Sequence, residues 1–185
     1  MNIKQKGLIV ALSSATALLA LNSSFTLAAS QGSQGSTSTG STDVSLQVND
    51  SVKITGIEDV TIPPVLQTAT GGTQEGGSFC VFRNGGDSVN ITASNPASGA
   101  TEFQLVGAAD GDIIQYTVAL ATGADASTTA ATDYNTAKTL TGSSTEFACG
   151  GTDTHSYEIF IAEQEVREAT TGAYSGTLQF LVEPI

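Results

Sequence analysis

Residues 43–55 read DVSLQVNDSVKIT, and apolar side chains alternate with polar ones along nearly the whole stretch. Asp50 is the one position that interrupts the alternation. A period of two places every second side chain on the same face, which indicates extended strands with one apolar face. We therefore predict two strands here, one over residues 43–50 and a second from residue 51 onward, with a bend at Asp50-Ser51.

Short apolar or alternating runs continue to the end of the chain, separated by turns rich in Gly, Asn and Asp. Pro63-Pro64 makes the run over 60–66 an edge or the end of a strand, and Asn84-Gly85 predicts a hairpin between 79–82 and 88–93. Further strands are expected at 102–106, 113–120, 138–140, 146–149, 157–162 and 173–183, loops at 71–77 and 123–135, and one helical turn at 163–169. Short strands at this spacing are typical of a β-sandwich, so the predicted fold class is all-β.

The N-terminus has the features of a secretory signal. Lys4 and Lys6 precede an apolar stretch over residues 7–21, and small residues that suit a signal peptidase follow at Ala28 and Ala29. The predicted organisation is a signal peptide over 1–29, a flexible polar tether over 30–42, a strand over 43–50 and a sandwich domain over 51–185. We therefore expect the chain to be exported.

The composition excludes several classes of partner. Six Lys and Arg stand against 18 Asp and Glu, which gives a formal net charge of −12. Nucleic acids and anionic lipids are bound by clustered Lys and Arg, so neither is an expected partner. One His and two Cys do not supply the usual four ligands of a zinc site, and we expect neither a metal nor a cofactor.

No group of residues has the pattern of a catalytic site, so we expect that the protein is not an enzyme. His155 has no Gly-x-Ser-x-Gly elbow to accompany it and is expected at the surface. Asp110 and Asp112 lack the complete D-x-D-x-D-G pattern of a calcium loop. The acidic residues over 163–168 are expected to form a solvated face.

Cys80 and Cys149 are expected to form a disulfide, because an exported chain matures in an oxidising compartment. The alternative is a pair of buried free thiols.

The C-terminal part of the chain carries a distinctive run, Gly172-Ala173-Tyr174-Ser175-Gly176-Thr177-Leu178. It follows the spaced cysteine pair and a series of short strands that begins at Cys80. This order of features resembles the spore coat protein U family, which includes pilin subunits of the archaic chaperone–usher pathway. Residues 50–54 lack the additional cysteine that such relatives often carry there.

The resemblance implies an incomplete immunoglobulin-like β-sandwich that lacks its last strand. In such pilins a periplasmic chaperone fills the gap, the N-terminal extension of the next subunit later replaces it, and an outer-membrane usher threads the polymer to the surface. Residues 43–50 then correspond to the donor strand, with Val44, Leu46 and Val48 as its apolar side chains. The residues expected to border the acceptor groove and the chaperone edge are Tyr174, Leu178, Phe180 and Val182.

Two features of the residues themselves favour the same interpretation. The chain stops at Ile185, soon after its last strong strand, and an alternating segment stands at the end of a polar tether. An open sheet edge and an extended apolar peptide are what β-strand addition requires. We therefore expect a subunit of a surface pilus, assembled as a homopolymer by donor-strand exchange and serving adhesion or biofilm formation.

Three alternatives remain open from the sequence. Residues 43–48 are the first strand of their own domain, or the protein is a secreted coat protein outside any filament, or it is a small carbohydrate- or receptor-binding sandwich.

Overall fold

The computed structural model describes residues 29–97, 99–123, 125–145 and 147–185. The predicted signal peptide, except for Ala29, lies outside these residues. The chain forms two units, residues 1–47 and residues 48–185. In the described part of the first unit every residue is exposed, and Ser30 and Ser41 exchange two backbone hydrogen bonds of 2.8 and 3.0 Å. None of the described helices is both long and apolar enough to cross a membrane.

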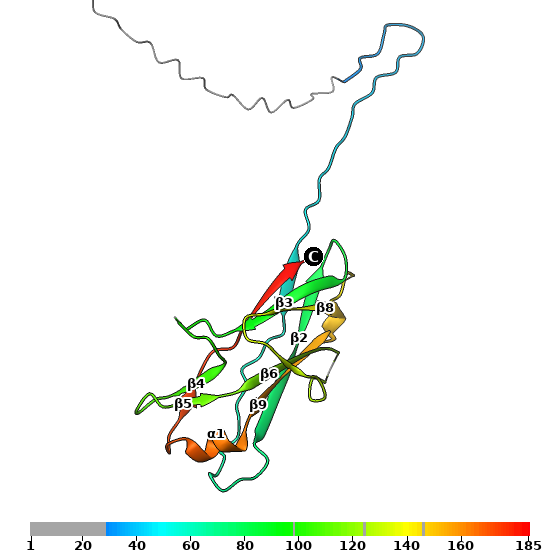
Figure 1. The fold of residues 1–185 in the computed structure, drawn as a ribbon. Coiled ribbons are helices and arrows are strands. Elements are labelled where there is room, and N and C mark those ends of the chain that lie inside the picture. Colours follow the sequence, from blue (N-terminus) through cyan, green and yellow to red (C-terminus); the bar gives the residue numbers. More distant parts are fainter. Residues whose placement is uncertain (1–28, 98, 124, 146) are drawn as a thin grey trace, which may run out of the picture. The chain divides into compact units, whose positions relative to one another are not determined.

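The second unit is built almost entirely from antiparallel strands (Figure 1). They are β1 (Val52–Thr55), β2 (Thr73–Arg83), β3 (Ser88–Ser94), β4 (Gln104–Gly107), β5 (Ile113–Gln115), β6 (Thr117–Thr122), β7 (Ala131–Thr132), β8 (Ala137–Thr141), β9 (His155–Ile161), β10 (Tyr174–Ser175) and β11 (Gln179–Pro184). Two short helices accompany them, η1 (Cys149–Gly151) and α1 (Glu163–Glu168).

The strands form one larger and two smaller sheets. The five-stranded sheet has the order β1-β2-β9-β6-β7, and the three-stranded sheets have the orders β11-β3-β8 and β10-β4-β5. The long strand β2 divides its pairing, since 73–79 pair with β9 and 80–83 pair with β1. The strand pattern therefore confirms the predicted all-β class.

The hydrophobic core consists of side chains that point inward from both the five-stranded sheet and the β11-β3-β8 sheet. Phe79 of β2 is fully buried, and its ring centroid lies 5.2 Å from that of Phe180 on β11. The other core side chains of β2, β3, β6 and β9 are Val81, Val89, Ile91, Ala93, Val118, Leu120, Tyr157, Ile159 and Ile161. Close packing of these side chains joins the two layers.

The predicted hairpin between 79–82 and 88–93 is wrong. The two strands exist as β2 and β3, but β2 pairs with β1 and β9 whereas β3 pairs with β11 and β8. The Asn84 side chain bonds the backbone of Asn49 and Ser51 instead of closing a hairpin. The turn therefore carries the chain from one layer of the sandwich to the other.

The predicted loop over 71–77 is also wrong in part, because Gly76 and Gly77 lie inside β2. A Cβ atom at Gly76 would stand 2.2 Å from the carbonyl oxygen of Tyr157, and one at Gly77 would stand 2.8 Å from its hydroxyl. These glycines serve the close approach of β2 and β9 and do not mark a turn.

Five other predicted elements differ from the structure. The run over 60–66 forms no strand, the strand over 113–120 is interrupted at Tyr116, and the strand over 173–183 is divided into β10 and β11. Among the described residues of 146–149 there is no strand, since η1 begins at Cys149, and the loop over 123–135 contains the short strand β7. The predicted helical turn over 163–169 is confirmed as α1.

A disulfide joins Cys80 of β2 to Cys149 of η1, as the sequence predicts. The two Cα atoms lie 5.9 Å apart, and the cysteines are separated by 69 positions in the sequence. The bond ties η1 and the irregular segment that precedes it to the long central strand.

The prediction that His155 lies at the surface is wrong. Its side chain is fully buried, and its ring stacks on Phe79 with centroids 5.4 Å apart. Nδ1 lies 2.8 Å from the Thr154 hydroxyl, while the buried Nε2 has no hydrogen-bond partner. Burial lowers the pKa of His155 to about 4.

This burial predicts a pH-dependent stability. The folded protein resists protonation of His155, whereas the unfolded chain takes up the proton near the ordinary pKa of about 6.5. The free energy of unfolding should therefore fall as the pH is lowered from about 6.5 to about 4, by up to about 1.4 kcal/mol per pH unit. Denaturant unfolding of the native chain and of His155→Phe at several pH values measures this, and equal slopes in that window would contradict it.

Candidate strand-binding groove

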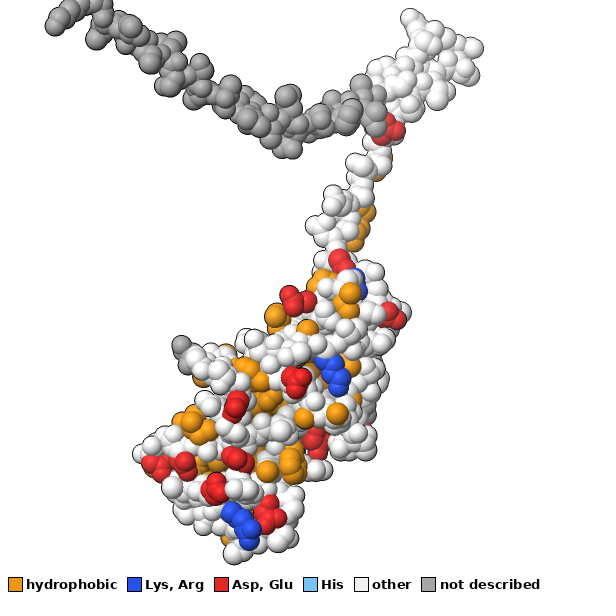
Figure 2. Space-filling view, viewed as in Figure 1, with side chains coloured by type: hydrophobic (Ala, Val, Ile, Leu, Met, Phe, Trp, Pro, Cys, Tyr) orange, Lys and Arg blue, Asp and Glu red, His pale blue; other side chains and the backbone are white. Residues whose placement is uncertain are grey.

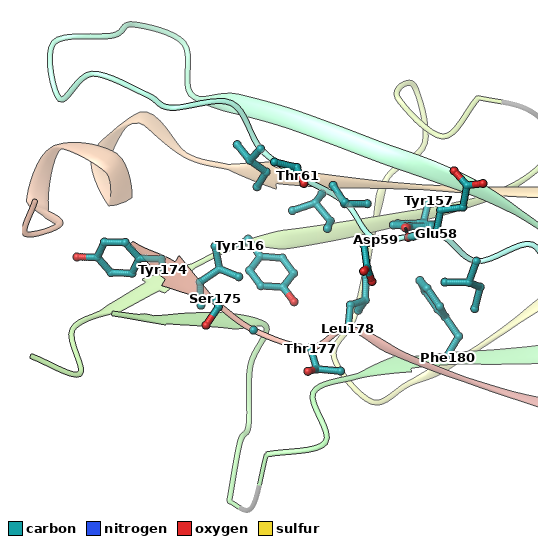
Figure 3. A pocket seen from close by; sticks show the side chains of 16 residues that line it. Glu58, Asp59, Thr61, Tyr116, Tyr157, Tyr174, Ser175, Thr177, Leu178 and Phe180 are labelled. Carbon is teal, nitrogen blue, oxygen red and sulfur yellow. Dashed lines mark hydrogen bonds between the residues drawn. The ribbon is translucent and has the colours of Figure 1, made fainter. Parts of the chain in front are cut away.

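An elongated groove with a volume of about 490 Å³ opens on the second unit (Figure 3). One wall is the segment over residues 57–62, which follows β1. The opposite wall is the segment over residues 174–180, which contains β10 and the start of β11. The 174–180 wall therefore contains strand residues, whereas the 57–62 wall forms no strand.

The floor of the groove is apolar. Leu105, Tyr116, Tyr157 and Ile159 line it, and the last three are largely buried. Burial raises the pKa of Tyr116 to about 12, so its ring carries no charge at neutral pH. The floor can thus accept apolar side chains, while the carboxylates of Glu58 and Asp59 line the groove from the 57–62 wall.

Backbone pairing stops at both walls. Over 56–66 the chain forms no strand, and Pro63-Pro64 removes two amide donors at the end of this wall. β11 pairs with β3 along one edge only, and within the described residues no ladder joins β11 to β1. Backbone groups at both walls are therefore left without a ladder partner within the described residues.

Hydrogen bonds hold each wall in place. The Tyr157 hydroxyl donates to the Glu58 carbonyl at 3.3 Å, which anchors the 57–62 wall. The Tyr174 hydroxyl donates to Asp112 at 3.0 Å, and the Thr170 amide donates to the same carboxylate at 3.0 Å. The Thr170 amide and the Tyr174 hydroxyl hold the pKa of Asp112 below its ordinary value. Asp112 therefore fixes the 174–180 wall.

Three other carboxylates also accept hydrogen bonds from segments distant in the sequence. Asp110 accepts a hydrogen bond from the Thr170 hydroxyl at 2.6 Å, and Glu165 accepts one from the Gln115 amide at 2.8 Å. Glu163 accepts from the Gly71 amide at 2.9 Å. The predicted solvated face over 163–168 thus contains two carboxylates that bond to neighbouring backbone. Figure 2 shows acidic side chains over the visible face of the unit, where Lys and Arg are sparse.

The structure places three of the four predicted groove residues together. Tyr174, Leu178 and Phe180 line the 174–180 wall, whereas Val182 is absent from the lining and packs against the core. Leu178 lies between β10 and β11, because the chain leaves its pairing with β4 after Ser175.

The opposite wall and the floor of the groove were not predicted from the sequence. Val60 and Ile62 are half-buried and alternate with exposed Asp59 and Thr61, so the period of two was the signal available for this wall. The floor side chains come from β4, β9 and the residue between β5 and β6. These residues are far apart in the sequence and come together only when the strands pair, so no short motif identifies them.

The segment over 43–50 has no strand assigned within the chain itself. Its apolar side chains are almost fully exposed, at 89% for Val44, 87% for Leu46 and 73% for Val48. Large apolar side chains spaced by two along an extended backbone are unusual at this exposure and indicate a surface for a partner.

The groove predicts a pair of variants with different effects. Phe180 packs against Phe79 and against Tyr157, whose ring centroids lie 5.2 and 5.1 Å away. Phe180→Ala should lower the free energy of unfolding by about 2–4 kcal/mol, because an aromatic contact at the core is lost. Leu181→Ala, one residue along and 53% exposed, should change it by less than about 0.5 kcal/mol. Equal losses in chemical denaturation would mean that β11 presents the wrong face.

The fold and the groove together define an all-β, immunoglobulin-like domain with an open lateral groove. No family model matches the chain, and no curated protein matches it. The family resemblance therefore rests on the quoted motifs alone.

Comparison with solved structures supports the fold. One matching chain comes from a structure described as a chaperone–tip adhesin complex vital for synergistic activation of CFA/I fimbriae biogenesis. The TM-score is 0.50 at 16% identity, and the match covers 74% of the present chain and 42% of the other. The present chain thus spans about two fifths of that neighbour's length, and the likeness shows a common immunoglobulin-like fold.

Proposed function

We propose that this protein is a structural subunit of a surface fimbria, in which the groove receives an extended strand from a neighbouring subunit. The single observation that carries the proposal is the groove itself. Its floor is largely apolar, its 57–62 wall forms no strand, and within the described residues β11 in the other wall pairs only with β3. Residues 43–50 are the strand that each copy supplies to the next.

The chemistry of the segment fits the groove. Burial of Val44, Leu46 and Val48 would contribute about 1.5–3 kcal/mol each before entropic costs. Backbone hydrogen bonds to the β11 edge would add to this, as in other cases of strand addition. A strand of this kind supplies affinity through the backbone and specificity through its alternate side chains.

The proposal includes the partners that such assembly needs. A periplasmic chaperone covers the groove before assembly, an outer-membrane usher passes the subunits outward, and the finished polymer stands on the cell surface, where it serves adhesion or biofilm formation. The solved neighbour's description names a chaperone, a tip adhesin and fimbriae biogenesis, which supports this setting.

The proposal contains no catalytic role. Within the described residues, no three His, Cys, Asp or Glu side chains gather as they would around a metal ion. His155 packs on Phe79 inside the core, and Asp110 and Asp112 anchor the wall of the groove.

Electrophoresis in SDS without boiling tests this function. Strand-exchanged polymers should run as a ladder of multimers and collapse to one monomer band after boiling, because a buried strand exchanges slowly. A chain without residues 30–50 should give the monomer band under both conditions. If the truncated chain forms the same ladder as the native chain, the donor-strand proposal fails.

A further inference from the structure

The Arg83 side chain hydrogen-bonds to three separate chain segments at one end of the second unit. Its guanidinium donates to the Asp50 carboxylate at 2.6 and 3.0 Å, to the Ser88 carbonyl at 2.5 Å and to the Ile185 carbonyl. The Arg83 side chain is 9% exposed and that of Asp50 is 35% exposed. The start of β3, the residue after β11 and the residues before β1 therefore meet at this end of the domain.

The neighbouring turn holds the residues before β1 along their backbone. Asn84 Nδ2 donates to the Asn49 carbonyl at 2.9 Å, and Asn84 Oδ1 accepts from the Ser51 amide at 2.7 Å. The Asn84 amide donates to the Ser51 carbonyl at 3.2 Å. A Cβ atom at Gly85 would stand 2.6 Å from the Asp50 carboxyl carbon, so the glycine makes room for this contact. Residues 49–51 contain no assigned turn or bend and lead directly into β1.

The directions of β1 and β11 show that the groove lies at the end of the domain away from Arg83. β1 begins opposite Arg83 and runs away from it, whereas β11 runs toward Arg83 and ends next to it. The groove walls over 57–62 and 174–180 follow β1 and precede most of β11. Residues 43–48 therefore join the domain at the end opposite to the groove and would have to double back to enter it.

The register of such a return is unfavourable. With a two-residue turn at Asp50-Ser51, Asn49 would face Val52 and Val44 would face Ile57. The groove wall over 58–62 would then face residues 39–43, which contain no apolar side chain. The returning strand would also run parallel to β11, because β1 and β11 run in opposite directions.

We propose that the short connection at residues 49–51 keeps the donor segment of each chain out of its own groove, so that only a second copy of this chain fills it. The inference rests on the proposed function and adds a restriction on the donor. A second copy enters without this connection and is free to run antiparallel to β11 in the register that buries its apolar side chains.

Insertion variants of the full chain test the restriction. About 12 Gly and Ser residues between Val48 and Asn49 give the segment enough contour length to return through its own groove in the antiparallel sense. This variant should become a monomer that forms no SDS-resistant ladder. The same insertion between Thr42 and Asp43 adds equal length on the other side of the segment, and this control should polymerise like the native chain.

A synthetic peptide of residues 42–50 gives the second readout. Added to freshly refolded monomer before strand exchange, it should raise the melting temperature of the native chain and of the Thr42/Asp43 insertion by roughly 5–10 °C. It should not change that of the Val48/Asn49 insertion, whose groove is already filled.

Two other results would overturn the inference in different ways. If the peptide raises the melting temperature of Leu46→Asp but not that of the native chain, the native segment occupies its own groove and the restriction is wrong. If neither the native chain nor Leu46→Asp responds to the peptide, the groove does not bind this strand, and the proposed function fails as well.

Discussion

Replacing Leu46 by aspartate should abolish the SDS-resistant polymer and leave the Cys80–Cys149 disulfide intact. Leu46 is the middle of the three apolar side chains of the segment and is 87% exposed within its own chain. In a neighbour's groove it would face an apolar floor, where a carboxylate would lose its hydration without gaining a partner. The loss of one buried leucine adds about 1.5–3 kcal/mol to this cost.

The matched control is Ser45→Asp. Ser45 lies one position before Leu46, so in an extended strand its side chain points to the opposite face. The added charge is the same in both variants, and only Leu46→Asp should prevent polymer formation. Loss of polymer in both would indicate that net charge, and not the groove, controls assembly. Non-reducing mass analysis of each variant reports the disulfide.

Removal of the disulfide should cause the largest change in the stability of the domain. Cys80 and Cys149 close a loop of 69 positions, for which the chain-entropy model gives a loss of about 4 kcal/mol. For a domain of this size, the melting temperature of Cys80→Ala/Cys149→Ala should fall by roughly 10 °C. Calorimetry in oxidising buffer measures the shift.

Reduction provides the internal control for this variant. A thiol reductant should lower the melting temperature of the native chain by a similar amount and leave the double variant unchanged. A native chain whose melting temperature does not respond to reduction would show that η1 is held to β2 by packing alone.

Elements were predicted correctly from the sequence where a residue's local pattern and its tertiary environment agree. Alternation over 52–55 predicted β1, and the apolar face of 157–162 matches β9, in which Ile159 and Ile161 are buried while Phe160 is 38% exposed. The disulfide followed from the export signal and the presence of only two cysteines.

The failures arise where distant segments decide the outcome. Asn84-Gly85 has the composition of a hairpin turn, but contacts with Asn49 and Ser51 redirect it between the sheets. His155 has polar neighbours in the sequence, yet β9 carries it under the ring of Phe79. Gly76 and Gly77 signal a loop by composition, whereas the nearby Tyr157 requires small residues in a strand.

The groove was predictable on one side only. Tyr174 and Leu178 belong to the motif over 172–178, and Phe180 follows it two residues later, so the sequence singled them out. Tyr116 and the 57–62 wall belong to the same groove through folding alone, and no spacing along the chain relates them to Tyr174. The resemblance indicated the kind of groove, and the strand pairing identified its other half.

The position of Arg83 has a mechanical consequence. Traction on the residues before Asp50 acts first on a carboxylate that Arg83 holds, and Arg83 also bonds Ser88 and Ile185. Tension is thus shared at once between β2 in one layer and the ends of β3 and β11 in the other. A subunit pulled by its neighbour would therefore load both layers of the sandwich through this one side chain.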